Sequence, residues 1–232
     1  MEIGELYAEG RQRIVGLVAD LSAEQAEAPV PTCPGWRVAD VLAHLTGICA
    51  DVLAGNLDGV ATDPWTEAQV AARRGRTVDE LVAEWMEVAP QVEALAGSFP
   101  GPIGEQWVTD LTTHEHDIRT ALARPGARDS AGVEMGVGFV VTAGLDSSVS
   151  EHALPPLEVR AGDSSWVAGA GAGVAVEAAG TLEGSSFELL RTLTGRRSAA
   201  QIRDLRWTVD PEPYIPAFQF GPFTTSPTDI IE

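Results

Sequence analysis

Residues 31–52 read PTCPGWRVADVLAHLTGICADV, a proline-containing turn followed by an uninterrupted helical pattern. Proline has no backbone N–H and clashes with the preceding turn of a helix, so no helix is expected to pass through Pro31 or Pro34. Beyond Trp36 the apolar residues recur every three or four positions, which predicts a helix with one buried face. That face consists of Val38, Val41, Leu42, Leu45, Ile48 and Val52.

The same spacing of apolar residues occurs before and after this helix. It predicts helices over residues 3–21, 65–88 with an interruption at Gly75, 104–122 and 133–145. Prolines and glycines mark the breaks between them, at residues 29–34, 63–64, 100–102 and 123–126. Helices joined by short breaks are typical of an antiparallel bundle. We therefore expect an N-terminal helical bundle that spans residues 1–152.

The pattern changes after His152. Apolar and polar residues alternate in segments 157–160, 165–167 and 174–177, with glycines between them, as in the strands of hairpins. A helix is expected over 187–193, ended by Gly195, followed by a short helix at 199–205 and a strand at 206–209. The proline-rich tail from Pro211 is expected to be extended. Residues 153–232 are thus predicted to form a small α+β domain, and the whole chain an α+β protein.

The composition argues against several classes of partner. The formal net charge is −19, from 34 acidic and 15 basic side chains, and so acidic a surface repels nucleic acids and anionic membranes. No apolar run approaches the roughly 20 residues that cross a bilayer. The first residues, MEIGELYAEGRQR, lack the basic start and apolar core of a signal peptide, so we expect a cytoplasmic protein. Cys33 and Cys49 are expected to be reduced cysteines with no special role.

A candidate metal site comes from two of the predicted helices. His44 lies at the edge of the buried stripe of the first, where it is either a metal ligand or a core histidine bonded to a backbone carbonyl. In WVTDLTTHEHDIRTAL (107–122), Asp110 and His114 are one turn apart on one face, so they either converge on one ion or form a surface pair. Asp117, three residues further, would accept the second ring N–H of a ligating histidine.

Two histidines and one carboxylate make three protein ligands, which leaves a fourth tetrahedral position open. That arrangement is typical of catalytic rather than structural zinc, although non-haem iron uses the same ligand types. Glu115 and His116 are expected to point away from the face that carries Asp110 and His114. His152 is assigned no role.

These residues also carry a family resemblance. PTCPGWRVADVLAHLTG (31–47) and DLTTHEHDIRTALARPGARDS (110–130) resemble the mycothiol-dependent maleylpyruvate isomerase family, which belongs to the DinB-like superfamily of four-helix metal proteins. The C-terminal segment, including FELLRTLTGRRSAAQI (187–202), is similar to the family's small α+β domain, which is related in shape to sterol-carrier domains. The resemblance extends over nearly the full chain.

The resemblance implies a ligand set. The family binds zinc through one histidine after the Pro-Gly-Trp turn and a Glu-x-x-x-His pair in a later helix. His44 and His114 match its histidines, and Asp110 stands in the glutamate position with a side chain one methylene shorter. Cys33 falls within the family's usual turn and is therefore not interpreted as a nucleophile.

The implied function is a cytosolic enzyme that activates the small thiol mycothiol at zinc, for isomerisation or S-transfer on a small electrophilic substrate. Arg74 is the candidate catalytic arginine, which would hold a carboxylate of the thiol or substrate, and His116 and Arg119 are candidates for further contacts to the thiol or substrate. Two alternatives remain: a metal-dependent hydrolase using zinc-bound water, and a non-catalytic small-molecule binding protein on the same scaffold. A monomer would suffice, because all three proposed ligands lie in one bundle.

Overall fold

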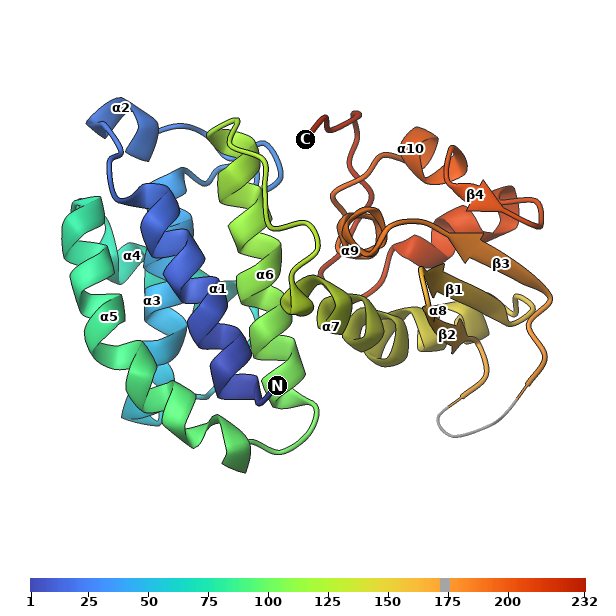
Figure 1. Cartoon of the computed structure of the whole chain (residues 1–232), viewed down its shortest axis with the longest axis horizontal. Helices are drawn as coiled ribbons and strands as arrows, with labels where there is room; N and C mark the ends of the chain where they lie inside the picture. Colours follow the sequence, from blue (N-terminus) through green and yellow to red (C-terminus); the bar gives the residue numbers. More distant parts are fainter. Residues whose placement is uncertain (172–175) are drawn as a thin grey trace. The chain divides into compact units, whose positions relative to one another are not determined.

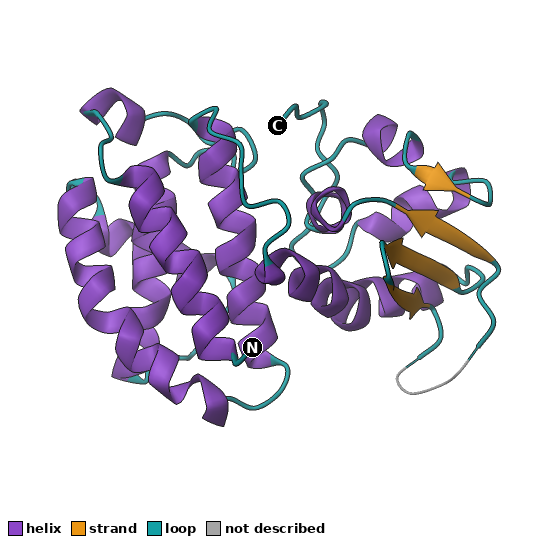
Figure 2. Cartoon of the chain, in the orientation of Figure 1, coloured by secondary structure: helices purple, strands orange, loops and turns teal. Residues whose placement is uncertain are grey.

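The computed structural model describes residues 1–171 and 176–232. It divides into two compact units, Met1–Gly126 and Ala127–Glu232, and each is described here by itself. Helices make up the first unit, and the second combines helices with a sheet (Figure 2). The α+β fold class is therefore confirmed. The division between the units lies before the boundary that we expected at residues 152–153.

Four long helices form the first unit, all of whose residues are described. They are α1 (Ile3–Val18), α3 (Val38–Ala54), α5 (Val78–Leu95) and α6 (Ile103–Ala121). Helix α1 packs on α5 and α6, and α3 packs on α5, α6 and the shorter α4 (Asp63–Arg73) (Figure 1). Two short elements, α2 (Ala23–Ala26) and the 3-10 turn η1 (Ala96–Ser98), complete the bundle.

Local sequence signals explain where these helices begin and end. Helix α3 ends at Gly55, which adopts a left-handed conformation with φ of 70° that glycine tolerates without strain. The Thr77 hydroxyl accepts a hydrogen bond from the Glu80 backbone N–H at the start of α5. We expected Asp63 and Pro64 to break the chain, but α4 begins there. Proline is compatible with the first turn of a helix, because its missing N–H has no partner in that turn anyway.

In the second unit, α7 (Ala131–Val140), a π-helical turn η2 (Val141–Leu145) and α8 (Asp146–Glu151) precede the sheet. Among the described residues, the strands are β1 (Leu157–Ala161), β2 (Ser164–Ala168), β3 (Gly180–Glu183) and β4 (Arg206–Trp207). Their order is β2-β1-β3-β4, with β1 antiparallel to β2, parallel to β3, and β3 antiparallel to β4. Helices α9 (Ser186–Leu193) and α10 (Ala199–Arg203) lie between β3 and β4 in the chain.

The apolar stretch at 133–145 was assigned to the bundle, but it belongs to the second unit. Its side chains form a core with those of the sheet and α9, namely Val133, Val137, Val140, Leu145, Leu157, Val159, Leu182 and Leu190. Periodicity shows that one face of such a helix is buried, but it does not show which partner buries it.

Two details of the C-terminal half differ from the expectations. The tail is not extended, because Glu212–Phe218 form a 3-10 helix, η3, that buries Tyr214, Ala217 and Phe218. Strand β3 was not expected at all. The strand expected at 174–177 falls partly on residues outside the described ranges, and Val176 and Glu177, which are described, are not in a strand.

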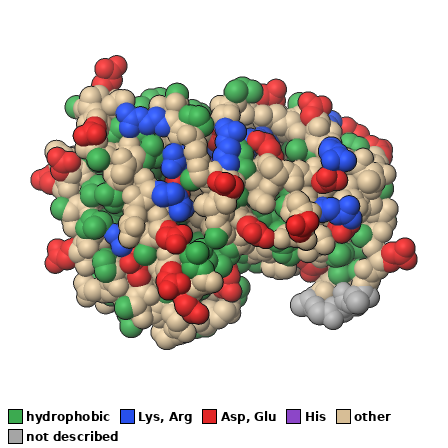
Figure 3. Space-filling view, in the orientation of Figure 1, with side chains coloured by type: hydrophobic (Ala, Val, Ile, Leu, Met, Phe, Trp, Pro, Cys, Tyr) green, Lys and Arg blue, Asp and Glu red, His purple; other side chains and the backbone are tan. Residues whose placement is uncertain are grey.

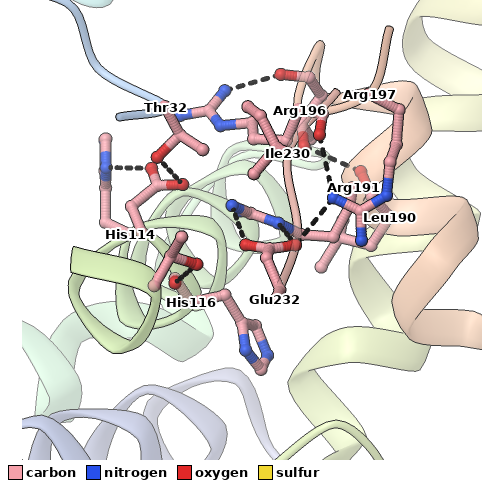
Figure 4. A network of polar contacts seen from close by, with 12 residues as sticks. Thr32, His114, His116, Leu190, Arg191, Arg196, Arg197, Ile230 and Glu232 are labelled. Carbon is pink, nitrogen blue, oxygen red and sulfur yellow. Dashed lines mark hydrogen bonds and ion pairs between the residues drawn. The ribbon is translucent and has the colours of Figure 1, made fainter. Parts of the chain in front are cut away.

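The end of the tail is held by buried arginines of the second unit. Arg191 Nη2 donates to Glu232 Oε1 at 2.7 Å, and Arg197 Nη1 donates to Glu232 Oε2 at 2.7 Å (Figure 4). The side chains of Arg191 and Arg197 are 0% and 4% exposed, so the shared carboxylate neutralises cations that would otherwise be costly to bury.

Acidic side chains are spread over the face drawn in Figure 3, in keeping with the net charge of −19. In the described parts of the chain, none of the helices combines the length and hydrophobicity that a bilayer span requires.

Candidate metal centre

Helices α3 and α6 bring the three expected ligands together. Asp110 Oδ2 lies 3.4 Å from His44 Nε2, and Asp110 Oδ1 lies 3.6 Å from His114 Nε2. One candidate ligand atom from each of the three residues lies within 4.8 Å of the other two. Both histidines are buried, whereas 33% of the Asp110 side chain is exposed, so the cluster is accessible on the carboxylate side.

The far nitrogen of His44 is bonded to a glutamine. His44 Nδ1 lies 2.9 Å from Gln69 Oε1, and Gln69 Nε2 donates to Asp51 Oδ2 at 2.8 Å. A carboxylate only accepts, so the amide nitrogen faces Asp51 and the amide oxygen faces the ring. His44 Nδ1 therefore carries the hydrogen, and its Nε2 presents a lone pair towards Asp110.

The far nitrogen of His114 is bonded to a buried carboxylate. His114 Nδ1 lies 3.0 Å from Asp117 Oδ2, while the Thr32 hydroxyl donates to Asp117 Oδ1 at 2.8 Å. Figure 4 shows the His114 ring and the Thr32 hydroxyl meeting at this carboxylate from two sides. The Asp117 side chain is 0% exposed, so its charge acts through a medium of low dielectric constant. Because this carboxylate accepts from the ring, the ring hydrogen lies on Nδ1. In the neutral ring His114 Nε2 then also presents a lone pair to Asp110.

This arrangement fits a divalent cation. With both ring hydrogens on Nδ1, two nitrogen lone pairs and a carboxylate face one another within 4.8 Å. Neutral imidazole nitrogens and carboxylate oxygens are the ligand types that zinc and iron take. A bound cation converts the mutual repulsion of these electron-rich atoms into attraction.

The turn before α3 covers the centre with an indole ring. Gly35 has a φ of 87°, the left-handed region that favours glycine, and the turn closes with Val30 N donating to Trp36 O at 2.9 Å. The Trp36 ring centroid then lies 5.3 Å from that of His44 and 5.9 Å from that of His114. The Pro-Gly-Trp segment therefore supplies an apolar wall beside the candidate ligands.

The first unit also matches a known family of proteins. Residues 7–125 match the family model described as the mycothiol maleylpyruvate isomerase N-terminal domain, which covers almost the same residues as the first unit. The chain belongs to the mycothiol maleylpyruvate isomerase family. The resemblance expected from the two motifs is thereby confirmed. A comparison with curated proteins gave no match.

Two solved structures share the fold of this family member. They are crystal structures of the mycothiol-dependent maleylpyruvate isomerase and of a histidine-to-alanine mutant of it, with TM-scores of 0.55 and 0.57. Each is 10% identical in sequence, and the alignment covers 90% of this chain and 92% of the other. At this identity the likeness establishes the fold alone.

The two cysteines of this family member differ in surroundings. Cys49 is buried and lies 3.3 Å from the Tyr7 hydroxyl, and burial raises the pKa of its thiol to about 12. It is therefore a thiol, not a nucleophilic thiolate, at neutral pH. Cys33 is half-buried and its Sγ donates to Asp117 Oδ2 at 3.2 Å. Together with His114 and Asp117 it forms a second group of candidate ligand atoms, which shares His114 with the first.

Arg119 and His116, two further candidates, and His152, to which no role was assigned, lie in different surroundings. Arg119 Nη2 donates to Glu115 Oε1 at 2.9 Å, so this guanidinium is held by a carboxylate of its own helix. His116 is 2% exposed, and it is absent from both groups of candidate ligands. His152 Nδ1 lies 2.8 Å from the Ser148 carbonyl oxygen of α8, a local backbone contact.

Arg74 lines a cavity of about 380 Å³ in the first unit. Arg37, Arg73 and Arg76 also line it, although each of these three is paired with a carboxylate. In the described structure no carboxylate lies within ion-pair distance of Arg74. Bonding to Arg37, with a smaller contribution from Arg74, lowers the pKa of Asp40 on the cavity wall.

The cavity wall shares two helices with the metal centre. Asp40 precedes His44 by one turn of α3, and Arg73 follows Gln69 by one turn of α4. Gln69 and Thr32 were not identified from the sequence, because neither belongs to a recognisable metal-binding pattern and both lie far from their partners along the chain.

Proposed function

We propose that this chain is a zinc- and mycothiol-dependent enzyme that isomerises, or transfers the thiol to, a small electrophilic substrate. The observation that carries the proposal is the convergence of His44, Asp110 and His114, in which both Nε2 atoms face the Asp110 carboxylate. Family membership supports mycothiol as the thiol, because the matching family is named for it.

Three protein ligands leave one coordination position for a further group. A bound zinc ion lowers the pKa of a thiol that coordinates it, so that the thiol is a thiolate near neutral pH. Asp110 neutralises part of the metal charge, and its exposed side leaves a route for the cosubstrate. Trp36 limits the access of water to both histidines.

The mycothiol thiolate is the nucleophile of the proposed reaction. Addition of its sulfur to a carbon–carbon double bond places the electron pair on the neighbouring carbon, next to an electron-withdrawing group. Rotation about the resulting single bond and departure of the thiolate then give the isomer. Displacement of a leaving group by the same sulfur gives the thioether product of a transferase.

We propose that Arg74 binds a carboxylate of the thiol or substrate. Replacement of Arg74 by glutamine is expected to raise the dissociation constant for mycothiol about tenfold, because a hydrogen bond between charged groups contributes roughly 1.5–3 kcal/mol. The constant is measured by titrating mycothiol into cobalt-substituted protein. Arg206→Gln, at an arginine side chain that is 79% exposed, is the matched control and should bind normally. Equal constants for Arg74→Gln and the wild type would remove Arg74 from the thiol site.

The central experiment measures metal content and then thiol coordination. Plasma mass spectrometry of the purified protein should find about one zinc per chain. After cobalt replaces zinc, added mycothiol should produce a thiolate-to-cobalt charge-transfer band, in the Cys33→Ser variant as well as in the wild type. The variant shows that the band does not come from the protein's own nearby thiol.

Each alternative has its own outcome in this experiment. Absence of metal, even after zinc is added back, would contradict an enzyme of this kind and favour a binding protein. One metal per chain without a thiolate band would favour the hydrolase, in which the open position takes water instead of thiol.

A further inference from the structure

Gln69 is a polar side chain buried between an imidazole that donates to it and a carboxylate that accepts from it. It is 2% exposed, its Oε1 lies 2.9 Å from His44 Nδ1, and its Nε2 donates to Asp51 Oδ2 at 2.8 Å. The other oxygen of Asp51 accepts from Asn56 Nδ2 at 2.9 Å. A chain of hydrogen bonds thus runs from Asn56 through Asp51 and Gln69 to the imidazole of His44.

The backbone of α3 is adapted to this glutamine. A Cβ atom added at Gly47 would lie 2.5 Å from the Cβ of Gln69, closer than carbon atoms approach in proteins. Gly47 lies inside a helix, where glycine is less favourable than alanine. Its presence lets α4 approach closely enough for the Gln69 amide to reach His44.

The two histidines of the centre therefore have unlike outer partners. His114 is bonded directly to the Asp117 carboxylate, whereas the negative charge of Asp51 reaches His44 only through a neutral amide. The amide can hold the ring in this tautomer only while Asp51 fixes which way the amide points, because an unfixed amide could present its NH2 group to the ring.

We propose that Gln69, oriented by Asp51, is the positioning residue that makes His44 a metal ligand. It holds the hydrogen of His44 on Nδ1 and directs the Nε2 lone pair at the metal position. The inference rests on the proposed zinc site and extends it to a helix, α4, that contributes none of the three candidate ligands.

Zinc affinity, measured by competition with a chromophoric chelator, tests this role directly. Gln69→Leu keeps a side chain of similar size and is expected to weaken zinc binding about 10- to 100-fold, the usual effect of removing a partner of a ligating histidine. Gln91→Leu changes an exposed glutamine of α5 and should bind zinc as the wild type does.

An exchange of the two polar groups separates positioning from packing. In Asp51→Asn with Gln69→Glu, the new carboxylate accepts from His44 Nδ1 and from the new amide, and the net charge is unchanged. This double variant should bind zinc within about threefold of the wild type, or more tightly, since a carboxylate is a common partner of ligating histidines. If Gln69 only packs α4 against α3, Gln69→Leu and the double variant, which both keep the size of the side chain, should bind zinc equally.

A result that contradicts the role of Gln69 can be told apart from one that contradicts the proposed function. A wild-type protein without zinc contradicts the zinc enzyme itself. Zinc bound equally well by wild type and Gln69→Leu, or no more tightly by the double variant than by Gln69→Leu, overturns the role of Gln69. If Gln69→Leu does not fold, Asp51→Asn alone serves instead and is expected to weaken zinc binding several-fold.

Discussion

Replacement of His114 by alanine is expected to lower the zinc affinity by more than about 100-fold, and to lower isomerase or transferase activity at least as far. Loss of an outer partner of a ligand commonly costs 10- to 100-fold, and loss of the ligand itself removes a whole metal–nitrogen bond. His114 is also the candidate ligand with the most extensive support, because Asp117, Thr32 and Cys33 all converge behind it.

The measurement is zinc content after dialysis together with chelator competition, followed by turnover of maleylpyruvate as an assay substrate. The matched control is His152→Ala, which removes a histidine bonded to the Ser148 carbonyl and should leave zinc content unchanged. Asp117 retains the Thr32 hydroxyl as a donor in His114→Ala, so the variant is expected to fold. Full zinc occupancy in that variant would disprove the proposed ligand set.

The helices and three of the four described strands, β1, β2 and β4, could be predicted because their signal is local. In α3 the apolar residues from Val38 to Val52 keep helical spacing, and the observed helix begins at Val38. What packs on a helix is not a local property, which is why the stretch at 133–145 was assigned to the wrong unit. The tail from Pro211 shows the same limit, since its prolines exclude an α-helix but are compatible with a buried 3-10 turn.

The candidate site also has residues that local spacing predicts and residues that it does not. The spacing of Asp110, His114 and Asp117 already fixes their common helical face, so the contact between His114 and Asp117 follows from the sequence. Gln69 lies 25 residues from His44 on another helix, and nothing in its neighbourhood marks it as a metal-site residue. Helical spacing likewise placed Glu115 off the ligand face, but it could not reveal that Arg13 of α1 binds this carboxylate, because the two residues lie 102 positions apart.

Glu115 carries the largest expected effect on stability. Its side chain is 0% exposed, and it accepts hydrogen bonds from Arg13 Nη2 at 2.8 Å and from Arg119 Nη2 at 2.9 Å. The Arg13 pair joins α1 to α6, two helices that pack on each other, whereas Arg119 lies on α6 itself. Glu115→Gln leaves two guanidinium groups without their shared carboxylate, and breaking a buried pair in this way costs about 3–5 kcal/mol. Because the Arg13 side chain is 27% exposed and can be hydrated, we expect the lower end of that range.

In a unit of the size of Met1–Gly126 a loss of about 3 kcal/mol lowers the midpoint of thermal unfolding by roughly 10–15 °C. The two compact units can unfold separately, so the transition to follow is the one that added zinc raises, which identifies the unit that holds the metal. Glu87→Gln, at an exposed glutamate of α5, is the control and should leave that midpoint unchanged.

Below its midpoint Glu115→Gln should still bind about one zinc per chain, because Glu115 belongs to neither group of candidate ligands. Loss of zinc without loss of stability would instead assign Glu115 to the metal centre, and its buried carboxylate would then act on the metal rather than only on the two arginines.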